Sequence, residues 1–343
     1  MDIGVGNAII ETTAVRVATT WIAPVASDLA RVEAELARFV PRDMPIAAEA
    51  FALALVAGGK RLRPALCLLS AGACGGVNED AIQLATIVEV VHLASLMHDD
   101  VVDEAELRRG QEATRVRWGN RASVLVGDYL VARAYRVLTM KIGDWATGLT
   151  CGAILEMCQG QFRHATGMAA DGDENAYMQI IRDKTGSLFR VACEMGACAA
   201  SDDARLSVAC AEYGMNLGVA FQIVDDLLDL YADSETTGKP LGSDLQTGQY
   251  TLPIIAALRA EGLRAEGAGA LRETLAEAGP GRLAEEQVRR VARLADELGG
   301  REYAAQMARG FAETARGGLG ELPASEYREG LEAACEDVLS RVP

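Results

Sequence analysis

The sequence predicts an all-α protein, and three observations support this fold class. Between Pro64 and Pro240 there is no proline, and the stretch is rich in Ala, Leu, Val, Glu and Arg, as long uninterrupted helices require. Clusters of Gly, Asn and Asp divide the chain into segments of about 15 to 30 residues, which is longer than an average globular helix. The sequence has no alternating strand pattern of useful length and no short internal repeat.

The breaks between the predicted helices follow from the positions of these clusters. In chain order they are the stretches at 72–80, 117–120, 141–148, 165–175 and 232–249. Several segments between breaks are apolar nearly all round, such as AIQLATIVEVVHLASLM, so we expect them inside a large helical bundle. Past Pro253 the chain becomes more polar and richer in Arg and Glu, which indicates amphipathic outer helices. We therefore predict a single all-α domain over residues 1–343.

Composition limits the classes of function. With 343 residues and 50% apolar content the chain can bury a large core. A net charge of -16 argues against binding to nucleic acids or anionic membranes, which need a surplus of Lys and Arg. The N-terminal MDIGVGNAII lacks the basic region of a signal peptide, and no apolar run approaches the roughly 18 residues of a membrane span. These features predict a soluble, cytoplasmic protein.

The cysteines are scattered and form no CxxC pair. Most have apolar or Ala- and Gly-rich neighbours, which is typical of buried, reduced thiols and not of disulfides or a zinc site. The eight are Cys67, Cys74, Cys151, Cys158, Cys193, Cys198, Cys210 and Cys335.

The segment HDDVVDEAELRRG at 98–110 contains the first of two acidic motifs. On a helix Asp99 and Asp103 are one turn apart and repel each other, while Asp100 points about 100° away. A lone motif of this kind is usually a solvated helix end. The preceding run is almost entirely apolar, however, so the carboxylates would end a buried helix at the mouth of a cavity. Carboxylates in such a place require a cation.

The same pattern recurs in FQIVDDLLDLY, where Asp225, Asp226 and Asp229 end another apolar helix. In an antiparallel bundle both acidic ends could face one cavity. Six carboxylates offer only hard oxygen ligands, which favours Mg²⁺ over zinc or copper. Because Mg²⁺ held by a few carboxylates completes its shell with substrate phosphate, the motifs predict a diphosphate substrate.

Basic residues occur in three places that suit phosphate binding. Lys60, Arg61 and Arg63 lie in GGKRLRP at a predicted helix start, Arg108 and Arg109 follow the first acidic motif, and Lys184 precedes Thr185 in a glycine-containing turn. Singly, each is more often a surface charge. Together with two acidic motifs they indicate two diphosphates, one held through Mg²⁺ and one by direct contacts.

These segments resemble the trans-polyprenyl diphosphate synthase family from about residue 50 to 260. The order and spacing of GGKRLRP, HDDVVDEAELRRG, GNRASVLVGDYLVARA, KTGSLF, FQIVDDLLD and GKPLGSDLQTGQYTLP carry the resemblance. It implies the isoprenoid synthase fold, a helical bundle around a deep central cavity, usually in a homodimer. It also implies condensation of isopentenyl diphosphate with an allylic diphosphate, such as farnesyl or geranylgeranyl diphosphate.

The resemblance assigns a role to each site residue. It implies that isopentenyl diphosphate is held by Lys60, Arg63, His92 and Arg109. It implies that Mg²⁺ on the allylic diphosphate is bound by Asp99, Asp100, Asp103, Asp225, Asp226 and Asp229. It implies that the allylic diphosphate or the developing cation is contacted by Arg108, Lys184, Thr185, Gln222 and Lys239.

Further positions outside these assigned roles also carry expectations. We expect His98 to make a supporting hydrogen bond near the first acidic motif. Gln249 stands where the family usually has a lysine, so one cation near the allylic diphosphate is missing. The small residues Ala94 and Ser95, one turn before Asp99, leave the path of the growing chain open, with Val91, Val90 and Ile87 on the next turns. A long-chain product is therefore predicted.

The sequence is also compatible with several alternatives. A terpene cyclase also uses a DDxxD motif with Mg²⁺, but it has no need of GGKRLRP or of a second complete motif. A non-catalytic subunit of a heteromeric synthase is expected to have lost carboxylates, whereas all six are present here. A short-chain synthase making farnesyl or geranylgeranyl diphosphate differs only in chain length. Ala94 and Ser95 could also be simple close-packing positions against a neighbouring helix.

Overall fold

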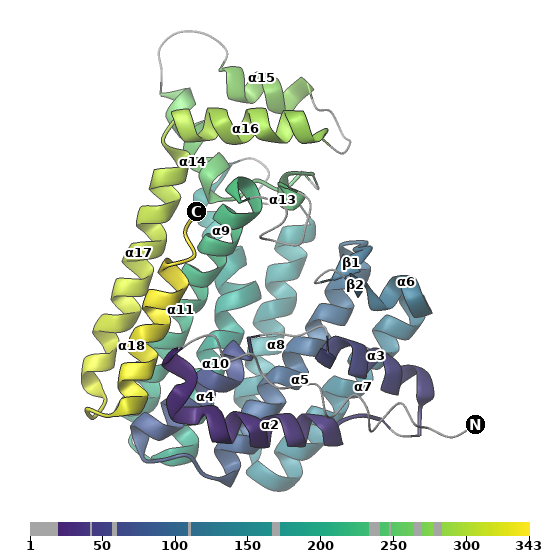
Figure 1. Ribbon diagram of the computed structural model, residues 1–343, viewed down its shortest axis with the longest axis vertical. Helices are drawn as coiled ribbons and strands as arrows, with labels where there is room; N and C mark the ends of the chain where they lie inside the picture. Colours follow the sequence, from purple (N-terminus) through teal and green to yellow (C-terminus); the bar gives the residue numbers. More distant parts are fainter. Residues whose placement is uncertain are drawn as a thin grey trace. The chain divides into compact units, whose positions relative to one another are not determined.

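The computed structural model describes residues 20–41, 43–56, 60–108, 111–166, 172–232, 241–246, 248–263, 269–277 and 283–343. Over these residues nearly all regular structure is helical, and an antiparallel pair of two-residue strands, β1 (Leu107–Arg108) and β2 (Gln111–Glu112), is the exception (Figure 1). The predicted all-α fold class is confirmed.

The helices follow the predicted breaks. The first half of the chain forms η1 (Thr20–Val25), α2 (Ala26–Arg38), α3 (Pro45–Val56), α4 (Leu62–Cys74), α5 (Glu79–Val102), α6 (Thr114–Trp118), α7 (Asn120–Val137), η2 (Leu138–Ile142) and α8 (Asp144–Ala165). The second half forms α9 (Glu174–Ile181), η3 (Arg182–Gly186), α10 (Ser187–Ala200), α11 (Ala204–Tyr231), α13 (Ser243–Gln246), α14 (Leu252–Gly262), α15 (Ala270–Glu277), α16 (Glu285–Glu297), α17 (Gly300–Gly318), η4 (Leu319–Glu321) and α18 (Glu326–Leu339). A helix ends in or beside every predicted break.

The chain divides into two compact units, each built from segments that are distant in sequence. The first unit contains 1–151, 191–211 and 320–331, and the second contains 152–190, 212–319 and 332–343. The two acidic motifs therefore belong to different units, and each is described within its own unit. The single domain expected from the sequence stays a prediction.

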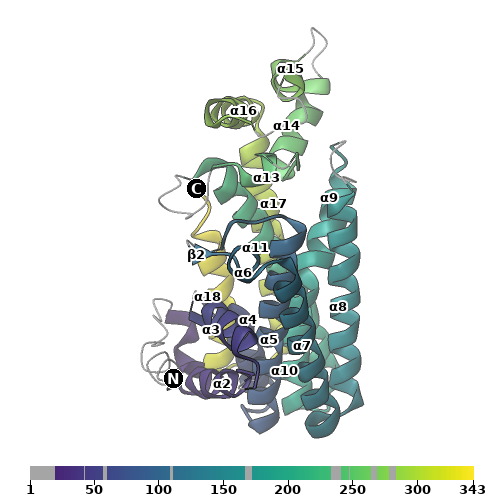
Figure 2. The ribbon, with the colours of Figure 1, turned by 90° about the vertical axis from the view of Figure 1, so that its right-hand side faces the viewer.

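Helix α5 is the central helix of the first unit and contacts α2, α4 and α7 (Figures 1 and 2). Its start is well specified, because the Asn78 side chain accepts a hydrogen bond from the Ala81 N–H and Glu79 and Asp80 lie in the first turn. Side chains are buried around most of its circumference, which agrees with the apolar run in the sequence. This helix carries the first acidic motif at its other end.

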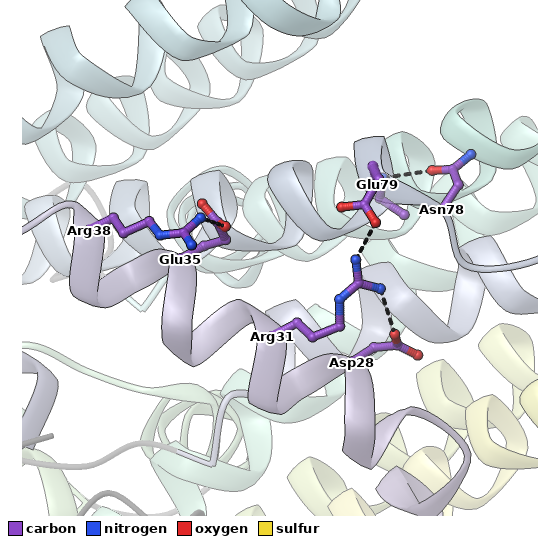
Figure 3. A network of polar contacts seen from close by, with 7 residues as sticks. Asp28, Arg31, Glu35, Arg38, Asn78 and Glu79 are labelled. Atoms are coloured by element: carbon purple, nitrogen blue, oxygen red, sulfur yellow. Dashed lines mark hydrogen bonds and ion pairs between the residues drawn. The ribbon is translucent and has the colours of Figure 1, made fainter. Parts of the chain in front are cut away.

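Charged residues fasten the start of α5 to α2. Arg31 on α2 contacts both Asp28, at 3.3 Å, and Glu79 in the first turn of α5 (Figure 3). A second pair on α2, Arg38 with Glu35, is local to that helix (Figure 3). These pairs are largely exposed, so their contribution to stability is small, and packing of the apolar faces dominates.

A buried ion pair fixes the beginning of α4. Arg61, 3% exposed, donates from Nη1 to Glu89 at 2.9 Å and from Nε to Glu33 at 2.5 Å. Its backbone lies in the left-handed region with φ 47°, a costly conformation for a residue other than glycine. The sequence pattern predicts Arg61 to be one of the phosphate-binding cations, but in the structure its guanidinium neutralises two carboxylates.

Part of the second unit is built around α14, which contacts α16, α17 and α9. Figure 2 shows α16 nearly end-on, next to α15. The buried residues of α16 are Val288, Val291, Ala292 and Ala295, spaced by three or four positions as one helix face requires. The predicted amphipathic character of the helices past Pro253 is confirmed for α16.

Helix α5 also has the length and composition of a membrane span. Among the described residues, this is the one helix that is both long enough and apolar enough to cross a membrane. However, 72% of its most apolar 18-residue window is buried inside the protein. Burial of this kind is typical of the core helix of a soluble protein.

Candidate active site

The first acidic motif lies at the C-terminal end of α5. Asp99 is half-buried, Asp100 is buried and Asp103, which ends the helix with its N–H bonded to the Asp99 carbonyl at 2.8 Å, is exposed. Three carboxylates at a helix C-terminus face the negative end of the macrodipole and also repel one another. Helix stability cannot explain this arrangement, so it indicates a site that needs a cation.

Arg108 on β1 neutralises one of these carboxylates. Its Nε and Nη2 lie 2.7 and 2.6 Å from Asp100 Oδ1. Burial raises the pKa of Asp100, and the adjacent Arg108 opposes that rise. Arg115 donates to the carbonyl oxygens of Glu104 and Ala105, at 3.1 Å each, and thereby holds the turn that leads from α5 to β1.

His98 makes the supporting contact expected from the sequence. Its Nε2 lies 3.2 Å from the Val124 carbonyl oxygen and 3.4 Å from Asp128 Oδ1, both on α7. Gly127 makes this approach possible, because a Cβ there would come within 2.3 Å of the imidazole. The acidic end of α5 is thus fastened to α7 one residue before Asp99.

A small cleft opens beside the first motif within the same unit. It encloses about 400 Å³, including solvent at its mouth, and is lined by both apolar and polar side chains. Its lining consists of Leu53, Ala54, Leu93, Leu96, Met97, Asp100, Arg108, Gln111, Glu112, Ala113 and Thr114. Ala94 and Ser95 are not among these residues: Ala94 is fully buried, and Ser95 donates from Oγ to the His92 carbonyl at 2.8 Å. Their role in chain length stays a prediction.

The second acidic motif lies near the C-terminal end of α11, and its central carboxylate is deeply buried. Asp226 accepts a hydrogen bond from Tyr177 Oη at 2.6 Å and another from Gln222 Nε2 at 2.8 Å. Burial raises the pKa of Asp226 well above its usual range, and the neighbouring Asp244 adds to this effect. Both oxygens of Asp226 therefore have protein donors, which points to a positioning role for this carboxylate.

The two flanking aspartates have different partners. Asp229 accepts bonds from Ser243 Oγ at 2.7 Å and from the backbone N–H groups of Ser243 and Asp244, so it caps the short helix α13. Asp225 pairs with Arg341, 2.7 Å away, and that guanidinium also lies over the Phe221 ring at 5.0 Å. Asp225 thus contacts the charged end of a long side chain.

Lys184 and Thr185 lie in η3, a π-helical turn between α9 and α10. Such turns are rare and occur frequently at functional sites. Thr185 Oγ1 donates to Gln222 Oε1 at 2.8 Å, which joins this turn to the second motif through Gln222 and Asp226. The turn is tightly enclosed, because a Cβ at Gly160 on α8 would lie 2.8 Å from the Lys184 backbone nitrogen.

The remaining predicted substrate-binding residues differ in exposure. Lys60 is exposed just before α4, Arg63 is half-buried in its first turn, and His92 is half-buried on α5. Arg109 and Lys239 lie outside the described residues.

The acidic residues suit Mg²⁺ but do not form a closed cage. Within the described parts of the chain, no three His, Cys, Asp or Glu side chains lie close enough to hold a metal ion by themselves. Mg²⁺ in phosphate-handling sites usually takes one or two carboxylates and fills its shell with water and substrate oxygens. The partly exposed pair Asp99 and Asp103, one turn apart, fits such an open site, and so does Asp225.

Sequence reasoning missed three residues that contact the motifs. Tyr177 and Arg341 lie 49 and 116 positions from their aspartate partners, and Ser243 lies 14 positions from Asp229. No local pattern marks Tyr177 or Arg341. Ser243 and Asp244 form part of the family segment GKPLGSDLQTGQYTLP, which was a signal for a role near the second motif.

The comparisons with known proteins agree with this site. The family model described as polyprenyl synthetase matches residues 45–285. The chain is 36% identical to an all-trans-nonaprenyl-diphosphate synthase (geranyl-diphosphate specific) of Rhodobacter capsulatus. The match covers 94% of this chain and 97% of the relative. The chain belongs to the polyprenyl synthetase family, and it is a prenyltransferase.

Two solved structures share the fold. A decaprenyl diphosphate synthase from Rhodobacter capsulatus superposes with a TM-score of 0.86 at 33% identity, covering 94% of this chain and 98% of that one. A polyprenyl synthase from Caulobacter crescentus, complexed with calcium and isoprenyl diphosphate, has a TM-score of 0.85 at 33% identity, with coverages of 94% and 97%. The all-α isoprenoid synthase fold expected from the resemblance is confirmed.

Proposed function

We propose that the chain condenses isopentenyl diphosphate head-to-tail with an allylic diphosphate and releases a long-chain all-trans polyprenyl diphosphate. The observation that carries the proposal is the pair of complete acidic motifs at the C-terminal ends of two buried helices, where helix stability disfavours them. The named synthases of octaprenyl to decaprenyl length among the relatives support it.

The proposed divalent ion is Mg²⁺, bound in the first motif by Asp99 and Asp103 and in the second by Asp225. Asp100, Asp226 and Asp229 are proposed to support these ligands, each within its own motif. When bound, Mg²⁺ supplies positive charge that stabilises the departing diphosphate. Calcium accompanies isoprenyl diphosphate in one related structure, which supports a divalent ion with oxygen ligands.

The basic residues are proposed to divide the two diphosphates between them. Isopentenyl diphosphate is held by Lys60, Arg63, His92 and Arg109. The allylic diphosphate is held by Arg108, Lys184 and Lys239. Their charges favour ionisation of the C1 to oxygen bond, because they bind the leaving diphosphate more strongly than the intact ester.

The carbocation that results needs oxygen dipoles but no strong nucleophile. Thr185 and Gln222 offer such dipoles, and their mutual hydrogen bond at 2.8 Å holds both side chains in place. Isopentenyl diphosphate then attacks through its terminal alkene carbon and loses a proton. Because no side chain is an obvious base, the departed diphosphate is the proposed proton acceptor.

Gln249 gives a test of the allylic assignment. It lies in a turn where its N–H bonds to the Asp244 carbonyl at 3.0 Å, next to residues that contact Asp229. Gln249→Lys is expected to lower KM for the allylic substrate, because it restores a cation that the family usually has there. Steady-state kinetics with a varied allylic diphosphate measures the change. An unchanged or higher KM would remove Gln249 from the allylic site.

Product length is the second test. Ala94→Tyr is expected to shorten the product while turnover is retained, because an aromatic one turn before Asp99 would close the path of the growing chain. Each helical turn below adds about 5.4 Å, roughly one extended isoprene unit. Chromatography of dephosphorylated products from the variant measures the length. A folded, active variant with an unchanged product distribution would make Ala94 a packing position and would remove the basis of the long-chain assignment.

The chain is further proposed to act as a cytoplasmic homodimer with one prenyltransferase domain per subunit. Large apolar side chains on α8 support dimerisation: Leu155 is 63% and Phe162 is 74% exposed, two turns apart on one face. Phe162→Glu is expected to yield monomers, because it places a charge in that face. Light scattering after size-exclusion chromatography measures the mass, and a dimer of the variant would exclude this face from the interface.

A chain-extension assay tests the function against its alternatives. The purified protein alone, with Mg²⁺, radiolabelled isopentenyl diphosphate and farnesyl or geranylgeranyl diphosphate, is expected to incorporate label, and a metal chelator is expected to stop incorporation. Failure of the protein alone to extend any allylic primer would favour a subunit of a heteromeric synthase. Release of a cyclic hydrocarbon without incorporation would favour a terpene cyclase.

A further inference from the structure

Five of the eight free thiols gather in the first unit, where α4 and α10 meet the first turns of α11. Cys74 Sγ, at the end of α4, lies 3.7 Å from Cys210 Sγ on α11. Cys198 on α10 is close enough to Cys74 for the two thiols to interact electrostatically. The cluster consists of Cys67, Cys74, Cys193, Cys198 and Cys210.

The end of α4, next to Cys74, is fastened to the end of α10. Asn78, four residues after Cys74, donates from Nδ2 to the Ala199 carbonyl at 2.6 Å. Gly75 lies so close to the end of α10 that a Cβ there would be 2.4 Å from the Ala200 carbonyl oxygen. Both contacts join α4 to the end of α10, a few residues before α11 begins. From 3.7 Å the two sulfurs need to approach by only about 1.6 Å more to form a disulfide.

The two thiols differ in access and in acidity. Cys74 is 8% exposed, whereas Cys210 is fully buried. The hydrogen bond from the Cys210 thiol lowers the pKa of Cys74, although burial opposes this, and the same contact and burial raise the pKa of Cys210. Since Cys74 is the more accessible of the two, we assign it as the attacking thiol and Cys210 as the resolving thiol.

The geometry points to a modification site for hydrogen peroxide at which Cys74 and Cys210 form a disulfide. The Cys74 thiolate attacks one peroxide oxygen, the O–O bond breaks, and hydroxide leaves and takes up a proton to become water. The Cys210 sulfur then attacks the sulfenic sulfur of Cys74, the S–O bond breaks, and the second water leaves with the Cys210 proton. Two thiols are oxidised, and one peroxide is reduced to two waters.

The disulfide would join α4 to α11 across 136 residues of chain. Cross-links that close long loops stabilise mainly by restricting the unfolded state. Asp225 lies fifteen residues beyond Cys210, about 22 Å further along the helix, so the acidic motif is remote from the cross-link. We expect oxidation to raise the melting temperature and to leave prenyl transfer unchanged.

Peptide mapping of the full chain by mass spectrometry tests directly for the intramolecular disulfide. The reduced protein is treated with one equivalent of hydrogen peroxide, alkylated, digested and analysed by mass spectrometry. A peptide pair linking Cys74 to Cys210, with a loss of two hydrogens from the intact mass, is expected. Cys158→Ser is the matched control, because Cys158 is exposed and outside the cluster, and it should give the same linked peptides.

A second variant tests whether Cys74 is the thiol that peroxide oxidises and Cys210 the thiol that resolves it. In Cys210→Ser the sulfenic acid at Cys74 has no partner, so dimedone is expected to label Cys74, and peroxide should no longer raise the melting temperature. Circular dichroism establishes that the variant folds. Alkylation of both Cys74 and Cys210 in peroxide-treated wild type, or a disulfide from Cys74 to Cys198 in place of Cys210, would overturn the proposal.

Discussion

Replacing Asp99 or Asp225 with alanine is expected to lower kcat by roughly 100-fold or more, the size of loss seen when one group is removed from a charge-stabilising site. Asp99 lies in the last turn of α5, at the negative end of its dipole, and both Asp99 and Asp225 have another aspartate four residues further on, so removing either should not weaken its helix. Steady-state kinetics at saturating Mg²⁺ and thermal unfolding measure the two effects separately.

Asp202→Ala serves as the matched control, since Asp202 is an exposed carboxylate in the turn between α10 and α11. It should retain both turnover and melting temperature. The Asp225 variant also loses a half-exposed contact to Arg341, which we expect to matter little for stability. Near-normal turnover of either motif variant at saturating Mg²⁺ would refute the metal assignment.

Arg61→Ala is expected to reduce the free energy of unfolding by about 3 to 5 kcal/mol, because it leaves the Glu89 carboxylate, 3% exposed, without its buried partner. Denaturant unfolding of the purified variant measures the loss. Glu89→Gln in the Arg61→Ala background should recover part of it, since the neutral amide carries no buried charge.

Arg38→Ala is the control for this prediction. Arg38 also pairs with a glutamate, Glu35, but its side chain is 71% exposed, so its loss should cost at most about 1 kcal/mol. If Arg61→Ala were as mild as Arg38→Ala, the buried pair would not be what fixes the start of α4.

Local sequence patterns predicted the parts of the molecule that depend on neighbouring residues. The Gly- and Asp-rich breaks were confirmed because they supply the turns that end helices, and the apolar run before Asp99 was confirmed as a buried helix. The contact of His98 near the acidic motif was also confirmed.

The residues that the sequence could not assign depend on packing between distant segments. Arg61 has the charge and the glycine-rich setting of a phosphate ligand, and only the fold brings Glu33 and Glu89 to its guanidinium. Tyr177 and Arg341 contact the second motif for the same reason. The acidic motifs themselves were recognisable because their spacing is local, whereas their partners are set by tertiary structure.

The most direct test of the account is the length of the product made by the protein alone. The chain is incubated with Mg²⁺, radiolabelled isopentenyl diphosphate and farnesyl diphosphate, and the dephosphorylated products are separated by chromatography. We predict all-trans polyprenols longer than the geranylgeranyl class. Products that stop at geranylgeranyl length would contradict the long-chain assignment, and the absence of any extended product would contradict the proposed synthase activity of this chain by itself.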